Sequence, residues 1–362
     1  MRRLLLLGGG HAHVHVLKAL AGETMPGAQV TLVSPFARQV YSGMVPGLVA
    51  GHYNVDDCVI PLAPLAARAK VKFIQSAACA LDASARTVRL EDGQVLHYDV
   101  LSVDTGPVMD RLAIPGAQEH ALFVRPIEDF IVAWEELFAL TQQQILSVAV
   151  IGGGAAGVEL ALALQYRLGE RARLSLVTGG PPALPSHPPR VQARALRALK
   201  RSGVTVLEDI CTEIASSHVQ LGRGMRLECD AAVLALGTGA PSWLRGSGLA
   251  LDPLGFIATG ATLQSTSHPE VFGAGDVASN ATMPTPKSGV HAVRAGPPLA
   301  LNLRRFIAAG RLQAHRPQGR SLNLLACGGR YAIASWGAWS AQGRWVWWWK
   351  DRIDREFVAK YR

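Results

Sequence analysis

The sequence predicts an α/β protein built from two copies of one unit: a buried strand, a glycine-rich turn, a helix and a second strand. The elements are 3–7, 8–13, 14–20 and 29–33 in the first copy, and 148–151, 152–159, 160–168 and 174–177 in the second. Each copy has about the 30 residues expected for a βαβ unit. Short apolar runs of this kind are typical of parallel strands that are covered on both faces. The repeat therefore predicts two Rossmann-like dinucleotide-binding domains, each with three layers and a parallel central sheet.

The glycines of both turns have the same physical reason. A tight turn followed by positions without Cβ allows backbone N–H groups to approach a pyrophosphate at the N-terminus of the helix. The predicted contacts are Gly8, Gly9, Gly10, His11 and Ala12 in the first turn, and Gly152, Gly154 and Gly157 in the second. One such motif is weak evidence, but two in equivalent settings indicate two nucleotide sites.

A third motif, Gly-Ala-Gly-Asp at 273–276, follows a short apolar run. It places Asp276 at the carboxyl end of a predicted parallel strand, where open α/β sheets bind their ligands. The motif lies far beyond the second unit and is expected to return the chain to the first sheet, so that the second domain is inserted into the first. The predicted domains are 1–115 with 247–312, then 116–246, and a C-terminal extension at 313–362.

Composition excludes several classes of protein. A chain of 362 residues with 49% hydrophobic and 17% charged residues is too apolar to be disordered. None of its apolar runs approaches the roughly 20 residues that span a bilayer, and the N-terminal run is too short for a secretory signal. We expect a cytoplasmic protein.

Five scattered cysteines form no C-x-x-C pair and indicate neither a disulfide framework nor a zinc ribbon. The net charge of +9 indicates an anionic partner. Cofactor phosphates, acidic lipid and nucleic acid all fit, and charge alone does not distinguish them. With the glycine motifs described above, we expect no nucleic-acid partner.

Two further segments carry distinctive motifs: Tyr-Ser-Gly-Met at 41–44, and Pro-Lys-Ser-Gly at 286–289. With the three glycine motifs, they resemble the pyridine nucleotide-disulfide oxidoreductase superfamily of flavoproteins, and within it the type II NADH dehydrogenases and sulfide:quinone oxidoreductases. The first turn, the Tyr-Ser-Gly-Met segment and the tail 343–355 are similar to the flavoprotein family associated with selenophosphate synthase.

The resemblance implies FAD, with its pyrophosphate at the first turn, its ribityl chain at Asp276 and its ring near Lys287 and Gly289. It also implies NAD(P)H at the second turn. Further residues that it assigns to the cofactors are Ser34, Pro35, Tyr41, Thr105, Gly106, Thr178, Gly239 and Gly275. Lys287 would stabilise the reduced ring, or be a solvated loop lysine. Glu159 would lie near the rings, or complement the helix dipole in the first turn.

Three positions depart from the family pattern. His13 replaces the third glycine of the first turn, which keeps the helix farther from the sheet unless the turn is wider. Ser34 replaces the acidic residue expected at the FAD ribose. Thr178 replaces the acidic residue that favours NADH in the second unit, so the preference between NADH and NADPH stays open. A metal at His11, His13 and His15 is disfavoured, because no further ligand lies nearby in the sequence.

The predicted function is transfer of electrons from NAD(P)H through flavin to a quinone or a similar acceptor. One alternative is oxidation of sulfide or selenium species linked to selenophosphate synthesis, with selenophosphate synthase as partner. Another is a flavin-bearing redox module with little turnover. No catalytic dithiol is available for disulfide reduction, and Cys327 is a lone candidate for sulfide chemistry.

The tail carries an aromatic stripe at four-residue spacing: Trp345, Trp349, Ile353, Phe357 and Tyr361. Two interpretations fit. Basic neighbours and tryptophan suit a helix that lies on the inner membrane surface. Aromatic stripes also pack against the protein itself or a second subunit.

We predict that the purified protein holds FAD and not FMN, because the first turn and the segment at Ser34 are arranged for an adenosine diphosphate half. Acid release followed by chromatography identifies the flavin. Recovery of FMN, or of no flavin, would contradict the prediction.

Overall fold

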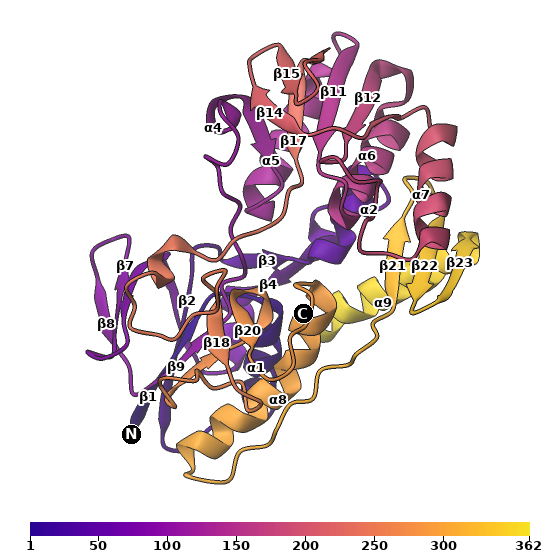
Figure 1. The fold of residues 1–362 in the computed structure, drawn as a ribbon. Coiled ribbons are helices and arrows are strands. Elements are labelled where there is room, and N and C mark those ends of the chain that lie inside the picture. Colours follow the sequence, from indigo (N-terminus) through magenta and orange to yellow (C-terminus); the bar gives the residue numbers. More distant parts are fainter.

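The computed structural model describes residues 1–362, and its first sheet is parallel with five strands in the order β19-β9-β1-β2-β5 (Figure 1). The strands are β1 (Arg2–Leu7), β2 (Ala28–Ser34), β5 (Lys72–Gln75), β9 (Val100–Val103) and β19 (Val271–Gly273). Leu4 of β1 pairs with Val30 on one side and Val100 on the other. The first repeat and the third motif therefore share one sheet, as expected.

The second sheet repeats this plan in the order β10-β17-β11-β12-β13, and all its pairings are parallel. Its strands are β10 (Ala121–Phe123), β11 (Leu146–Ile151), β12 (Ala172–Val177), β13 (Thr205–Leu207) and β17 (Ala231–Leu234). Two Rossmann-like domains, the second inserted into the first, are thus confirmed.

Helices cover one face of each sheet, and a three-stranded antiparallel sheet covers the other. The helices are α1 (His11–Gly22), α3 (Leu62–Arg68) and α8 (Gly289–Ile307) on the first sheet, and α5 (Ile127–Leu140), α6 (Ala155–Leu168) and α7 (Pro189–Arg201) with the second. The antiparallel strands are β6 (Ala78–Asp82), β7 (Thr87–Leu90) and β8 (Val95–His97), and β14 (Cys211–Ile214), β15 (His218–Leu221) and β16 (Arg226–Glu228).

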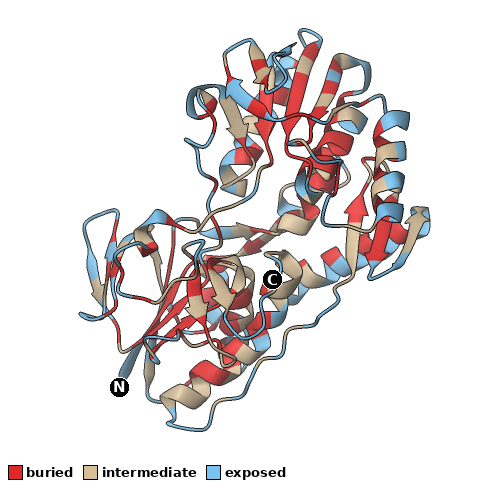
Figure 2. Cartoon of the chain, viewed as in Figure 1, coloured by how far each residue is buried: buried red, intermediate tan, exposed pale blue.

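The leucine run of β1 shows why the strands read as continuously apolar. Leu4 and Leu6 belong to the core on the helical face, whereas Leu5 and Leu7 pack with the antiparallel layer. Side chains alternate between the faces of a strand, so a strand with two covered faces needs apolar residues at every position. Figure 2 shows the resulting buried strands in both domains.

The two crossovers between the domains run side by side. Val108 and Gly239 exchange backbone hydrogen bonds of 3.0 and 2.8 Å in an isolated antiparallel bridge. The remaining short elements are β3 (Arg38–Val40), α2 (Val45–Val49), β4 (Val59–Pro61), α4 (Ala117–His120), β18 (Ile257–Thr259) and β20 (Ala278–Asn280). The paired crossovers bring the carboxyl ends of the two parallel sheets toward one another (Figure 1).

The C-terminal extension forms an antiparallel sheet and a long helix that passes between the domains (Figure 1). It consists of β21 (Asn323–Ala326), β22 (Ala332–Trp336), β23 (Trp339–Gly343) and α9 (Arg344–Tyr361). The helix was predicted, but the sheet was not, because its strands are short and lack a strong alternating pattern. None of the helices is both long and apolar enough to cross a membrane.

Candidate functional site

The first glycine turn lies against the end of β9. Gly8 has φ +96°, and a Cβ placed there would lie 2.4 Å from the carbonyl oxygen of Asp104. A Cβ on Gly10 would lie 2.3 Å from the Asp104 carboxyl carbon. Both positions therefore require glycine, and the turn delivers the chain to the N-terminus of α1 in close contact with the neighbouring strand.

His11, the first residue of α1, supplies a test of whether an anionic cofactor fits this turn. Its Nδ1 lies 3.1 Å from the Gln39 side chain, and its ring contacts those of Tyr41 and Phe357. Nε2 is buried and has no hydrogen-bond partner. Burial, with a smaller contribution from Arg125, lowers the pKa of His11 to about 4. An unpaired buried nitrogen at a helix N-terminus suits a cofactor phosphate or ribose hydroxyl.

His13 explains how the first helix tolerates the loss of the third glycine. Its ring is fully buried, with Nδ1 2.7 Å from the carbonyl oxygen of Gly8 and Nε2 2.8 Å from Oγ of Ser102. Because a carbonyl only accepts, Nδ1 carries the proton and Ser102 donates to Nε2. The ring thus bridges the turn and β9.

The three histidines of the first turn do not converge on one point. His11 faces Gln39, His13 lies beneath the helix, and Nδ1 of His15 is 3.2 Å from the hydroxyl of Tyr361. Each ring has a different protein neighbour, so their spacing reflects packing and hydrogen bonding rather than a shared ligand.

The residues assigned to the ribityl chain and ring gather after β19. Asp276 is partly buried, and burial raises its pKa although Arg125 and Lys287 oppose the shift. Helix α8 begins at Gly289, directly after Ser288, as predicted. Lys287 is not a solvated loop lysine: its Nζ lies 3.9 Å from the centre of the Phe256 ring and donates to the carbonyl oxygen of Ala278.

Arg125 is a candidate site residue that nothing in the sequence had indicated. It lies between β10 and α5 of the second domain, yet its charge acts on both His11 and Asp276 of the first. Its guanidinium makes no hydrogen bond or salt bridge with the protein, and burial lowers its pKa. No glycine motif marks this position, so only the fold brings it to the turn.

The remaining residues assigned to FAD lie around the same sheet edge. Ser34 is buried and its hydroxyl donates to the carbonyl oxygen of Phe36, while Pro35 is exposed. Tyr41 packs on Phe357 with ring centres 4.4 Å apart. Thr105 and Gly106 lie just beyond the end of β9, after Asp104. The Ser34 hydroxyl is therefore already engaged where the family pattern has an acidic group.

The second turn is built like the first, with all three of its motif glycines in place. A Cβ on Gly152 would lie 2.3 Å from the carbonyl oxygen of Ala235, and one on Gly157 would lie 1.8 Å from that of Gly152. Gly154 has open space beside it at the N-terminus of α6. Thr178 is 6% exposed, and its hydroxyl donates to the carbonyl oxygen of Leu207.

Glu159 does not complement the dipole in the first turn of α6, so that interpretation is wrong. It lies in the second turn of the helix, and its Oε1 accepts a 2.7 Å hydrogen bond from the backbone of Ala326 in β21. Burial raises its pKa to about 7, while Lys350 opposes the shift. The sequence could not show this contact, because the strand that makes it was not recognised.

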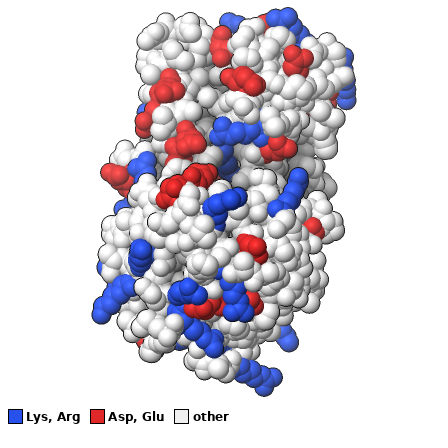
Figure 3. Space-filling model, turned by 90° about the vertical axis from the view of Figure 1, so that its left-hand side faces the viewer, with Lys and Arg blue, Asp and Glu red and all other residues white.

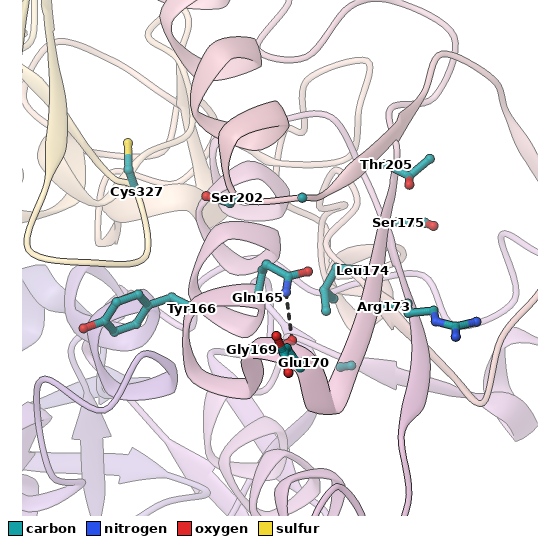
Figure 4. Close-up of a pocket in the computed structure, with 12 residues that line it drawn as sticks. Gln165, Tyr166, Gly169, Glu170, Arg173, Leu174, Ser175, Ser202, Thr205 and Cys327 are labelled. Carbon is teal, nitrogen blue, oxygen red and sulfur yellow. Dashed lines mark hydrogen bonds between the residues drawn. The ribbon is translucent and has the colours of Figure 1, made fainter.

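An open cavity of about 720 Å³ lies at the opposite end of α6 from the glycine turn (Figure 4). Gln165 and Tyr166 of α6, Ser175 of β12 and Thr205 of β13 line it, and Cys327 reaches it from the C-terminal sheet. Burial raises the pKa of Cys327 to about 12. The thiol is therefore protonated at neutral pH. Cys327 lies next to Ala326, the residue whose backbone N–H is bonded to Glu159.

Comparison with known proteins agrees with this geometry. The family model for pyridine nucleotide-disulphide oxidoreductases matches residues 2–296. The chain belongs to this family. It is accordingly an FAD-dependent oxidoreductase with NAD(P)H as its second cofactor.

Two curated relatives are similar over most of their length. Demethylphylloquinone reductase of Synechocystis is 27% identical over 76% of this chain and 71% of its own. Type II NADH:quinone oxidoreductase of Staphylococcus aureus is 25% identical over 84% of this chain and 83% of its own.

Solved structures show the same fold. The sulfide:quinone oxidoreductase of Aquifex aeolicus has a TM-score of 0.83 at 20% identity and covers 100% of this chain and 92% of its own. The NDH2 of Plasmodium falciparum in complex with NADH also has a TM-score of 0.83, at 14% identity, over 99% and 97% of the two chains.

We predict that Arg125→Gln weakens FAD binding about tenfold or more, because a hydrogen bond to a charged group contributes roughly 1.5–3 kcal/mol. Fluorescence titration of the apoprotein with FAD measures the change. Arg111→Gln is the matched control, since Arg111 lies over the Phe123 ring and its charge is not among those that act on His11 or Asp276. Equal affinities of Arg125→Gln and the wild type would remove Arg125 from the site.

Proposed function

We propose that this chain passes electrons from NAD(P)H through FAD to a quinone. The observation that carries the proposal is the pair of glycine turns at the carboxyl ends of two parallel sheets, together with Asp276 beside the first turn. Both curated relatives are named for reactions with quinones, one of them with NADH as the donor. Residues 1–115 and 247–312 would hold FAD, and 116–246 would receive the nicotinamide cofactor.

Flavin, when bound, supplies the capacity to accept a hydride and to release electrons to the acceptor. The chain's own residues bind and orient it. Gly8–Ala12 would receive the pyrophosphate, and Asp276 would accept a hydroxyl hydrogen bond from the ribityl chain. The N-terminus of α8 at Gly289 would place its positive dipole end at the ring, with Lys287 adding charge nearby.

The nicotinamide site would lie at Gly152, Gly154 and Gly157, with the ribose near Thr178 and the crossover residue Gly239 close to the rings. The Thr178 hydroxyl donates to Leu207, so its oxygen can still accept a bond from a 2′-hydroxyl. It carries no negative charge that would repel a 2′-phosphate. Both NADH and NADPH suit such a site, and we propose weak discrimination between them.

Oxidation of sulfide or selenium species is a weaker proposal. It needs a reactive thiolate, and the Cys327 thiol has a pKa raised to about 12. The relatives described above do not name a selenium compound, so a partnership with selenophosphate synthase rests on the sequence resemblance alone. A redox module with little turnover remains the outcome if no donor reduces the flavin.

The decisive experiment is anaerobic reduction of the purified protein. We predict that NADH or NADPH bleaches the visible flavin band, that a soluble quinone restores it, and that sulfide alone leaves it unchanged. The reason is that the chain provides a nucleotide turn but no thiolate relay. Bleaching by sulfide and not by either nucleotide would reverse the assignment, and loss of all three responses would favour the low-turnover module.

We also propose that the C-terminal extension touches a membrane surface on the cytoplasmic side. The aromatic stripe of α9 is divided: Phe357 and Tyr361 pack against His11 and His15 of the first domain. Trp345, Trp348, Trp349 and Ile353 are exposed, as are Trp336 and Trp339 of the adjacent hairpin. An ordinary protein surface exposes large apolar side chains singly, whereas here several are exposed on one helix and the hairpin next to it.

The excess positive charge does not by itself identify the partner. On the face drawn in Figure 3, basic and acidic side chains are interspersed. The membrane proposal therefore depends mainly on the exposed tryptophans, with Arg344 and Arg352 beside them as the basic contribution.

We predict that Trp345→Ser with Trp348→Ser lowers binding to anionic liposomes about tenfold, because binding scales with buried apolar area. Co-sedimentation measures it. Leu112→Ser with Leu254→Ser removes two apolar side chains elsewhere that are even more exposed, and should leave binding unchanged. Point variants are preferred to truncation, because the same helix packs on the first domain. Failure of the intact protein to sediment with liposomes would rule out this surface.

A further inference from the structure

The two glycine turns differ in one buried carboxyl group. At the end of the strand beside the turn, Asp104 in the first domain occupies the place of Ala235 in the second. The backbone N–H of each donates a 2.8 Å hydrogen bond to the last residue of the neighbouring strand in the sheet, Leu7 of β1 or Ile151 of β11. The carbonyl oxygen of each is also the atom that a Cβ on Gly8 or Gly152 would meet. The second domain is thus an internal reference for the first.

The Asp104 carboxylate binds the N-terminus of α1 from inside the protein. Its Oδ2 accepts hydrogen bonds of 2.8 and 2.9 Å from the backbone N–H groups of Ala12 and His13, and the residue is 2% exposed. The carbonyl oxygen of Asp104 accepts a third bond, from Gly10. In the second turn Ala235 has no side chain with which to do this, and the first N–H groups of α6 stay available.

The other carboxyl oxygen, Oδ1, lies where the two cofactor motifs meet. A Cβ on Gly10 or on Gly275 would each lie 2.4 Å from it. Oδ1 accepts no hydrogen bond from the protein, whereas Oδ2 accepts two. Asp104 therefore joins the first turn to the Gly-Ala-Gly-Asp segment, directly beneath the place proposed for the pyrophosphate.

The charges around Asp104 do not neutralise it. Asp276, beyond Gly275, is a second carboxylate, and its charge raises the pKa of Asp104 further after the main effect of burial, to about 7. On α1, His13 is neutral, because burial lowers its pKa to about 4, and the pKa of His11 is lowered equally. Arg125 and Lys287 act on Asp276. A pyrophosphate would add two negative charges to this group.

We propose that Asp104 is protonated in the FAD-bound protein at neutral and mildly alkaline pH, so that FAD binding at the first turn takes up one proton from solvent wherever Asp104 of the free protein is ionised. An ionised Asp104 competes with the pyrophosphate for the same partial positive charge at the N-terminus of α1 and repels it at short range. A protonated Asp104 can still accept from Ala12 and His13 through Oδ2. Its other oxygen then becomes a donor. The inference depends on the proposed placement of FAD at Gly8–Ala12.

The direction of the pH dependence follows from this exchange. Bound FAD raises the pKa of Asp104 above its value in the free protein. Below the free value the acid is protonated in both states, and affinity is independent of pH. Between the two values each step of one pH unit upward weakens FAD binding by about tenfold, because the proton must be taken from an increasingly dilute pool.

Isothermal titration calorimetry of the apoprotein with FAD, at about pH 8 in two buffers of different ionisation enthalpy, counts the protons exchanged. We expect uptake of about one proton by the wild type and none by Asp104→Asn, which keeps the accepting oxygen and cannot ionise. The Asn variant should also bind FAD with an affinity that does not change between about pH 6 and 9. Asp92→Asn, in an exposed turn, is the control and should behave as wild type.

The outcomes are distinct. FAD binding by the wild type without proton uptake, or uptake that persists in Asp104→Asn, would overturn the inference and leave the proposed function intact. Absence of FAD binding at every pH would overturn the proposed function itself. If Asp104→Asn does not fold, Asp104→Ala reproduces the arrangement of Ala235 and should likewise abolish the uptake.

Discussion

The close approach of each glycine turn to the end of the neighbouring parallel strand is the constraint on which the rest of the structure depends. At Gly8 and at Gly152 an added Cβ would overlap the carbonyl oxygen of the next strand at 2.4 and 2.3 Å. Only this contact places the helix N-terminus at the carboxyl edge of the sheet, where its dipole can meet a phosphate. The same contact occurs twice, so the molecule has two turns of one design. Their different uses depend on the few side chains that differ between the copies.

Two of those differences are in contact with each other. His13 replaces a glycine and Asp104 replaces an alanine, and the backbone N–H of His13 donates to the Asp104 carboxylate. The His13 ring also bridges Gly8 and Ser102. These two hydrogen bonds hold the bulky ring in place where the second turn has only a glycine. A buried histidine and a buried carboxyl are each costly alone, but together they leave the backbone of the turn satisfied. The interior of the first turn is therefore more polar than that of the second, although the backbone follows the same path in both.

The parallel sheets, the glycine turns, the start of α8 and the helix at 344–361 were predictable from sequence because each depends on local pattern: apolar runs, glycine spacing and helical periodicity. The role of Asp104 was not predictable, since its hydrogen-bond donors Ala12 and His13 lie some ninety positions away in the sequence. Arg125 was missed for the same reason. The environment of Glu159 depended on β21, a four-residue strand without alternation. The contacts that could not be predicted are thus those between side chains far apart in the sequence, because only the folded chain brings them together.

The C-terminal helix adds a second polar connection between the domains. Lys350 of α9 forms a 2.7 Å ion pair with Asp354 and donates to the carbonyl oxygen of Gly43, in the segment after Tyr41. Its charge also acts on Glu159 of the second domain. Burying such a pair contributes little net stability, because desolvation offsets the Coulomb attraction, but loss of either partner would leave a buried charge uncompensated. We infer that α9 fixes the first domain relative to α6 through these groups, while its exposed tryptophans remain free to engage a surface.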